Sequence, residues 1–178
     1  MEIGKITSKF GVLYIEYSER QTINDAATTV VSKQQFQHVA HPDLMEALEK
    51  IIPHLVLLTE QAHLDKQQMR LMHDVRLIRD HFKDYKVTGF SLKGSEDNLS
   101  IVIIGQRTLS NGKTISLCTP NQKFNDENDH YDYASELFLH VDKVRAEAEL
   151  YMSGKAAPSP QTEMDFEEEN QEGVRKAS

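Results

Sequence analysis

Apolar and polar residues alternate along the first forty residues with the period of two that is typical of β-strands. Ile3 to Thr7 and Val12 to Ser18 predict two strands, with Gly11 as a break before the second. Thr28 to Val39 is rich in β-branched residues and predicts a third strand. Residues 19–27 are polar and predict a loop. This part of the sequence therefore predicts three consecutive strands.

The spacing of apolar residues changes to three or four after Pro42, which suits the first turn of a helix, where Asp43 favours the helix dipole. The apolar positions that recur at this spacing are Leu44, Leu48, Ile51, Leu55 and Leu58. Pro53 lies within the pattern and predicts a kink or a division near Lys50, because proline interrupts the helical hydrogen bonds. Residues 62–84 are ambiguous, and one apolar face among many charges favours a further helix.

A second group of alternating segments follows the helical region. Lys86 to Lys93, Leu99 to Leu109 and Lys113 to Thr119 predict three strands. Residues 94–98 predict the first turn between them, and residues 110–112, Ser-Asn-Gly, predict the second. Asn-Gly between alternating segments is a strong hairpin signal. These strands are therefore expected to pair antiparallel.

The last segment with a helical period is predicted to begin at Asp129 or His130 and to end at Gly154. Its apolar stripe consists of Ala134, Leu137, Val141, Val144, Ala148 and Tyr151. The acidic residues at its predicted start are Asp126, Glu127, Asp129 and Asp132. We interpret them as favourable helix-dipole charges rather than as a metal site.

The predicted order is three strands, helices, three strands and a helix. Because hairpin-linked strands pair antiparallel, it predicts an α+β fold with an antiparallel sheet of about six strands in two three-strand groups, each followed by helix. The shared plan of the two halves leaves an internal duplication open. Residues 1–153 are expected to form one α+β domain, and residues 154–178 a disordered acidic tail.

Composition narrows the class of protein. A length of 178 residues suits one domain plus a tail. The single cysteine, Cys118, excludes an intramolecular disulfide and fits a reducing cytoplasm. Met1 to Lys5 has no apolar run behind it, so no signal peptide is expected, and Ile101 to Ile104 is far too short to span a bilayer. We therefore expect a soluble protein of the cytoplasm, without membrane contact.

Charge is distributed unevenly along the chain. The net charge of −8 argues against a protein that coats duplex DNA. Residues 66–124, however, carry ten basic and five acidic residues, whereas residues 125–153 carry two and eight. A locally basic middle in an acidic protein is compatible with binding an anion or a nucleic-acid strand.

Motifs of catalysis are absent from the sequence: it contains no Gly-x-Ser-x-Gly, no Walker-type phosphate loop and no His-Glu-x-x-His. Cys118 is interpreted as a small residue in a strand. The histidines, among them His38, His41, His73 and His81, lack the paired spacing of structural zinc sites and are interpreted as surface or helix-capping residues. We expect a non-enzymatic protein without cofactor or metal. A closed polar pocket with converging histidines and carboxylates would reopen the enzyme class.

Aromatic and basic residues are interleaved on the predicted strands, a pattern with which proteins bind single-stranded nucleic acid. The aromatic candidates are Tyr14, Tyr17, Phe36 and Phe90. The basic candidates are Lys33, Lys93, Arg107 and Lys113. Stacking on the aromatic rings would hold bases, and the cations would contact phosphates. The alternative is that the aromatic residues belong to the core or are ordinary strand residues.

The predicted tail contains the segment 161–166, Gln-Thr-Glu-Met-Asp-Phe, in polar, proline-bearing surroundings. A lone Met and Phe cannot form a core there, so they are either idle or anchors for another protein. Gln161, Met164 and Phe166 resemble the bacterial sliding-clamp-binding motif. The resemblance implies that Gln161 hydrogen-bonds at the edge of a clamp pocket while Met164 and Phe166 bury apolar surface inside it. The segment departs from the strongest form of the motif in having Met164 for leucine and an intervening Asp165.

The layout of the remaining chain resembles that of small uncharacterised phage-encoded proteins. The segments that carry this resemblance are His41-Pro42-Asp43-Leu44 with Pro53-His54-Leu55, then Val87-Thr88-Gly89, Gly112-Lys113 with Thr119-Pro120, and Gly154-Lys155. The resemblance implies a role in the DNA metabolism of a phage or another mobile element, in the cytoplasm of a host bacterial cell.

Together these features predict a non-enzymatic accessory protein of phage or plasmid DNA replication or recombination. Its core would bind single-stranded DNA or a replication protein, and its tail would tether it to a sliding clamp, which raises effective concentration. The alternative is a protein-interaction module or inhibitor that acts on a host clamp or defence protein without binding DNA. A homo-oligomer is left open.

Overall fold

The computed structural model describes residues 1–9, 12–23, 26–36, 40–94, 98–124 and 131–155. The first strands are β1 (Glu2–Lys9), β2 (Val12–Ile23) and β3 (Ala26–Phe36). They are followed by helices α1 (Pro42–Glu49), α2 (Ile52–Leu58), α3 (Lys66–Leu71) and α4 (Val75–His81). After these come β4 (Tyr85–Lys93), β5 (Ser100–Thr108), β6 (Thr114–Cys118), the short β7 (Gln122–Lys123) and helix α5 (Ala134–Met152).

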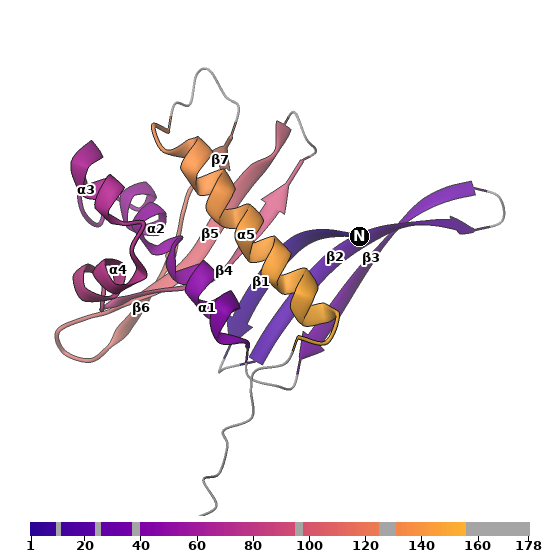
Figure 1. The fold of residues 1–178 in the computed structure, drawn as a ribbon, viewed down its shortest axis with the longest axis horizontal. Coiled ribbons are helices and arrows are strands. Elements are labelled where there is room, and N and C mark those ends of the chain that lie inside the picture. The colour runs from indigo at the N-terminus through magenta and orange to yellow at the C-terminus, as the bar shows by residue number, and fades with distance from the viewer. Residues whose placement is uncertain (10–11, 24–25, 37–39, 95–97, 125–130, 156–178) are drawn as a thin grey trace, which may run out of the picture.

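The strands form one antiparallel sheet, which confirms the predicted α+β class. The strand order is β3-β2-β1-β4-β5-β6, and β7 pairs with β5 (Figure 1). Each three-strand group is a meander, and the two groups meet where β1 pairs antiparallel with β4. This arrangement puts β1 and β4 at the centre of the sheet. An internal duplication stays a prediction.

A long two-stranded ribbon replaces the predicted loop at 19–27, so that prediction is wrong. β2 continues to Ile23 and pairs with β3 from Ala26 onward, in an unbroken register through Arg20↔Thr29. Figure 1 shows this ribbon extending beyond the rest of the sheet. Its residues are largely exposed, so no alternation of buried and exposed positions marks it as β-structure in the sequence.

The predicted division of the first helix at Pro53 is confirmed. α1 ends at Glu49 with Lys50 as its C-cap, and α2 starts at Ile52 with Pro53 in its first turn. A proline in the first turn loses no helical hydrogen bond, because that N–H has no partner within the helix. The predicted apolar stripe is therefore divided between two helices, and both contribute residues to the core.

The ambiguous segment 62–84 contains two short helices rather than one. Asp65 caps α3 by accepting hydrogen bonds from two backbone N–H groups, and the Gln68 side chain accepts one from the Asp65 N–H, which completes a capping box. Asp74 caps α4 in the same way through the Arg76 N–H. Two N-caps nine residues apart in sequence explain why the apolar face does not run through a single helix.

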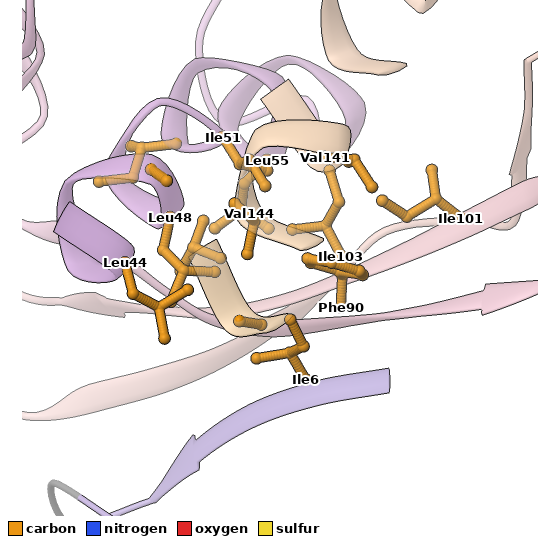
Figure 2. Packing of buried hydrophobic residues seen from close by; sticks show 14 of the residues in the cluster. Ile6, Leu44, Leu48, Ile51, Leu55, Phe90, Ile101, Ile103, Val141 and Val144 are labelled. Carbon is orange, nitrogen blue, oxygen red and sulfur yellow. The ribbon is translucent and has the colours of Figure 1, made fainter. Parts of the chain in front are cut away.

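The hydrophobic core lies between one face of the sheet and helices α1, α2 and α5. Figure 2 labels ten of its residues, drawn from both layers: Ile6, Leu44, Leu48, Ile51, Leu55, Phe90, Ile101, Ile103, Val141 and Val144. Phe90 is fully buried among them and has no exposed surface. Burial of this apolar area is the main source of stability for the fold.

Gly105 allows the α2 layer to approach the sheet closely. A Cβ atom at Gly105 would lie 2.3 Å from Cδ2 of Leu55 and 2.6 Å from the carbonyl oxygen of Lys86. Neither distance is compatible with a side chain, so the glycine at this β5 position is required by packing rather than by backbone conformation.

Helix α5 begins later than predicted, at Ala134 instead of Asp129 or His130. A turn precedes it, in which the Ala134 N–H donates to the Tyr131 carbonyl, and Tyr131 packs against the core. Residues 125–130 and the tail from residue 156 onward lie outside the described residues. No helix in the described ranges is long and apolar enough to cross a membrane.

Candidate nucleic-acid interface and a histidine cluster

The two faces of the sheet carry different chemistry because side chains alternate along each strand. On β1, Ile3 and Ile6 face the helices and are fully buried. Lys5, Thr7 and Lys9 therefore face away from the helices. We call this opposite side, which bears no helix among the described residues, the uncovered face (Figures 1 and 2). Residues paired directly across strands share a face, so the register identifies its members.

The register extends the uncovered face from β1 across β2 and β3. Thr7 pairs with Tyr14, and Tyr14 pairs in turn with Gln35. In the neighbouring row Lys5 pairs with Glu16, and Glu16 pairs with Lys33. A shallow hollow of about 490 Å³ lies over these rows, lined mainly by Lys5, Thr7, Lys9, Tyr14, Lys33 and Gln35. We call it the β1–β3 hollow.

The β1–β3 hollow holds more positive than negative charge. Its lining contributes the ammonium groups of Lys5, Lys9 and Lys33 and the carboxylate of Glu16. The Lys33 Nζ lies 3.1 Å from Oε2 of Glu16, and the Lys33 side chain is 78% exposed. An ion pair as exposed as this contributes little to stability. The three ammonium groups are thus available to an anion, with Glu16 as the local competitor.

Tyr14 supplies the aromatic surface of the hollow. Its side chain is 37% exposed, whereas its neighbours Leu13 and Ile15 on β2 are buried. Thr7 and Gln35 flank it across the strands and offer a hydroxyl and an amide. The hollow therefore combines cations, an aromatic ring and neutral hydrogen-bonding groups on one rigid surface.

The predicted basic residues divide between two faces and a turn. Lys33 lies in the β1–β3 hollow. Lys93 lies on the uncovered face as well, two positions along β4 from Ser91, which pairs with Lys5. Arg107 lies on the helix side, where it donates a hydrogen bond of 3.1 Å to Oε1 of Gln61 and stacks over the Tyr85 ring at 5.2 Å.

Lys113 lies at the β5–β6 turn, where its backbone N–H donates to Oδ1 of Asn111. The turn is separated in the sheet from the hollow by β4. The structure therefore brings Lys33 and Lys93, but not Arg107 and Lys113, onto the face that carries Tyr14.

The predicted aromatic residues divide in the same way. The prediction that Phe90 binds nucleic acid is wrong, because its side chain is fully buried in the core. Tyr17 and Phe36 are half-buried on the helix side, and Phe36 packs against Tyr151 of α5 with ring centroids 4.9 Å apart. Tyr14 is the predicted aromatic residue that reaches the uncovered face.

Lys5 and Lys9 belong to the hollow but are not among the binding residues predicted from the sequence. The pattern that indicates them is the alternation of Lys5, Thr7 and Lys9 around Ile6. The signal was weak because Ile3 has the same parity as these polar residues. An irregularity in the β1–β2 register between Ile3 and Lys5 places Ile3 on the opposite face from Lys5.

A second polar cluster lies on the helix side, where His54 and His140 are both buried. Nδ1 of His54 lies 2.8 Å from the Tyr131 hydroxyl, and Nε2 lies 3.3 Å from Nδ1 of His140. The interpretation of all the histidines as surface or capping residues is therefore wrong for these two. It is confirmed for His41, whose Nδ1 accepts a hydrogen bond from the Asp43 N–H at the start of α1.

Burial keeps both of these imidazoles neutral at physiological pH. It lowers the pKa of His54 to about 3, with further contributions from the charges of His140 and His73. It likewise lowers the pKa of His140 to about 4, assisted by His73 and the lysines nearby. His73 and Glu136 adjoin His140, and one ligand atom from each of these three residues lies within 4.8 Å of the others. This set could hold a metal ion.

The remaining residues singled out in the sequence lie in a strand, in a turn or outside the described residues. Cys118 ends β6 and is exposed, which confirms its placement in a strand. Asp132 is described and exposed at the turn before α5. Asp126, Glu127 and Asp129 lie outside the described residues, as do His38 and the tail residues Gln161, Met164 and Phe166.

Two candidate sites lie in the described part of the chain, one on each side of the sheet. The uncovered face offers one candidate site, the β1–β3 hollow with Tyr14 at its centre. The helix side offers the other, in the histidines around His140. No family model, curated protein or solved structure matches this chain.

Proposed function

We propose that the protein binds single-stranded DNA through the uncovered face, as a non-enzymatic accessory of phage or plasmid DNA replication or recombination. The observation that carries the proposal is the β1–β3 hollow, in which Lys5, Lys9 and Lys33 surround the exposed Tyr14. Positively charged grooves with aromatic stacking platforms are the usual means of binding single strands without sequence preference.

The chemistry of the hollow favours a single strand over a duplex. Stacking on Tyr14 requires an unpaired base whose face is accessible, and a duplex buries its base faces in its own stack. The lysines would contact phosphates on either side of the stacked base, and the Thr7 hydroxyl would hydrogen-bond to the strand. The overall charge of −8 opposes non-specific coating of DNA, so binding depends on this local basic surface.

The tail would add a second contact. On the resemblance of Gln161, Met164 and Phe166 to the clamp-binding motif, the protein is tethered to a bacterial sliding clamp while the sheet holds DNA. When one of two linked contacts has formed, the second becomes intramolecular, and its effective concentration rises although neither contact is stronger. A modest affinity of the hollow for DNA is then sufficient for function.

Fluorescence anisotropy with a labelled thymidine oligonucleotide tests the DNA proposal. We expect the affinity to fall steeply as salt rises, because each neutralised phosphate contributes about −0.7 to the slope of log K against log salt for single strands. The triple variant Lys5→Gln, Lys9→Gln and Lys33→Gln should lose most of that slope. The matched control is Lys66→Gln with Lys83→Gln, two exposed lysines on the helix side, which should keep it.

Absence of DNA binding at every salt concentration would reject the proposal and favour the alternative class, a module or inhibitor that acts on a host clamp or defence protein. The clamp contact is tested separately with purified clamp and the full chain. Binding should be lost in the double variant Met164→Ala with Phe166→Ala. Equal binding by that variant would reject the tether and leave the DNA proposal standing.

A further inference from the structure

Three potential metal ligands converge from two segments that are distant in sequence. Glu136 and His140 lie one turn apart on the same face of α5, and His73 lies in the connection between α3 and α4. Nδ1 of His73 lies 3.6 Å from Oε1 of Glu136, and the His73 and His140 rings are 6.2 Å apart between centroids. One ligand atom from each residue lies within 4.8 Å of the other two.

We propose that His73, Glu136 and His140 bind a divalent transition-metal ion with the preferences of Zn²⁺. Imidazole nitrogens and a carboxylate oxygen are zinc ligands, with bonds of about 2.0–2.2 Å. Around a tetrahedral ion such ligands lie about 3.3 Å from one another. The His73 side chain is 60% exposed, which leaves space for the small rotation that would close the set. Glu136 contributes the negative charge that a cation requires.

The surroundings of His140 support a ligand role, because a buried second shell orients its ring. His54 contacts Nδ1 of His140, and the Tyr131 hydroxyl contacts His54 on its far side. Metal-binding histidines are commonly held in this way by a polar partner behind the ring. A plain ion pair between His73 and Glu136 would explain those two residues alone, and would not account for the buried His140 placed beside them.

Positive charges near His140 must also be considered. Lys50 and Lys143 both lie close enough to affect its titration, and the Lys50 backbone carbonyl is a neighbouring acceptor. The charge of Lys50 is partly offset by Glu46, whose Oε1 lies 3.7 Å from its Nζ. Glu136 faces the ligand set directly. A cation at this place therefore has one carboxylate as ligand and two lysines in its surroundings, one of which is paired with Glu46.

The site would have a structural consequence for the helix layer. α3 and α4 span six and seven residues, lengths at which a helix has little stability of its own. A metal held by His73 and by two residues of α5 would cross-link the connection between α3 and α4 to the longest of the described helices. Three protein ligands also leave a fourth position for water or a small ligand, as in catalytic rather than structural zinc sites.

Calorimetric titration of the untagged, chelator-treated full chain with Zn²⁺ tests the site, and Co²⁺ absorption reports the coordination geometry. We expect one equivalent to bind, and His73→Ala and Glu136→Gln each to weaken binding by at least about ten-fold. At the same concentration, Zn²⁺ should raise the melting temperature of the wild type more than that of these variants. The matched controls are His63→Ala, an exposed histidine, and Glu149→Gln on α5, which should bind as the wild type does.

Both test variants alter residues outside the buried core, so circular dichroism should show folded protein for each. Failure to bind a stoichiometric ion would overturn the proposal and leave a simple His73–Glu136 ion pair. Binding that survives both variants unchanged would overturn it as well, since the ion would then occupy other residues. Neither outcome affects the DNA-binding proposal, which depends on the opposite face of the sheet.

Discussion

The covered and uncovered faces of the sheet are built by the same strands but differ in which residues they carry. On the covered face Ile6, Phe90 and Ile103 are fully buried beneath α1, α2 and α5. On the uncovered face Lys5, Thr7 and Tyr14 occupy the alternate positions and stay accessible. Apolar burial dictates the residue type on the first face. It places no such demand on the second, where the choice of residues is open to function.

Because core packing and the proposed DNA contacts lie on opposite faces of the sheet, we expect the stability of the fold and the affinity for DNA to change independently. A large-to-small substitution on the covered face should lower the free energy of unfolding by several kcal/mol, because it removes packing contacts in the core. A substitution on the uncovered face should change that free energy by about 0.5 kcal/mol or less. Its effect should appear in DNA affinity instead.

Phe90→Ala should lower the free energy of unfolding by about 3–5 kcal/mol, because it leaves a cavity in the centre of the core. Urea denaturation followed by circular dichroism measures this loss. The matched aromatic control is Tyr14→Ala on the uncovered face, with an expected loss of about 0.5 kcal/mol. A small loss for Phe90→Ala would remove Phe90 from the core and restore its predicted role in stacking.

Gly105→Ala should destabilise the protein by about 1–3 kcal/mol, because the added methyl group overlaps Leu55 and the Lys86 carbonyl. Gly4→Ala is the matched control, since the nearest atom to its added Cβ, the Glu16 carbonyl oxygen, is 3.9 Å away. Denaturation midpoints of the two variants test the close approach of α2 to β5. Equal midpoints would contradict that packing.

Tyr14→Ala should weaken binding of a thymidine oligonucleotide by about 1–3 kcal/mol, the usual contribution of one stacked base. Tyr14→Phe keeps the ring and should bind almost as the wild type does. Anisotropy titrations at one fixed salt concentration compare the three proteins. If Phe fails to rescue the loss, the hydroxyl rather than the ring makes the contact, and the stacking model is wrong.

Glu16→Gln should produce the smallest change, a rise in DNA affinity of about 0.5 kcal/mol, because it releases Lys33 from an exposed ion pair. Glu19→Gln serves as the control, because Glu19 lies three residues along β2 and outside the hollow. The gain should shrink at high salt, where the ion pair is already screened. A fall in affinity would show that Glu16 positions Lys33 instead of competing for it.

Local patterns in the sequence predicted most of the architecture. The Asn-Gly hairpin, the division at Pro53 and the two three-strand groups each depend on short-range signals. The β2–β3 ribbon beyond residue 18 did not show a signal, because a strand that buries neither face has no apolar alternation. The polar amino acids of that segment are the reason why the sequence predicts a loop there.

The candidate sites were harder to predict because they depend on contacts between distant segments. His54 and His140 meet across the helix layer, and no spacing in the sequence relates them. The residues of the β1–β3 hollow come from three strands, and the irregularity near Gly4 changes which face Ile3 occupies. Lys33 and Tyr14 could be identified as candidates one at a time, but their shared face required the strand register.

The meeting of the two meanders at β1 and β4 has a consequence for folding kinetics. Each meander pairs strands that are neighbours in sequence, so both can form early through short loop closures. Ile6 pairs with Phe90 only after β2, β3 and helices α1 to α4 have been brought into a closed loop. The entropic cost of closing that loop must be offset by the pairing of β1 with β4 at the centre of the sheet. We expect the docking of β1 on β4 to limit the folding rate, and the two half-sheets to be the units that form before it.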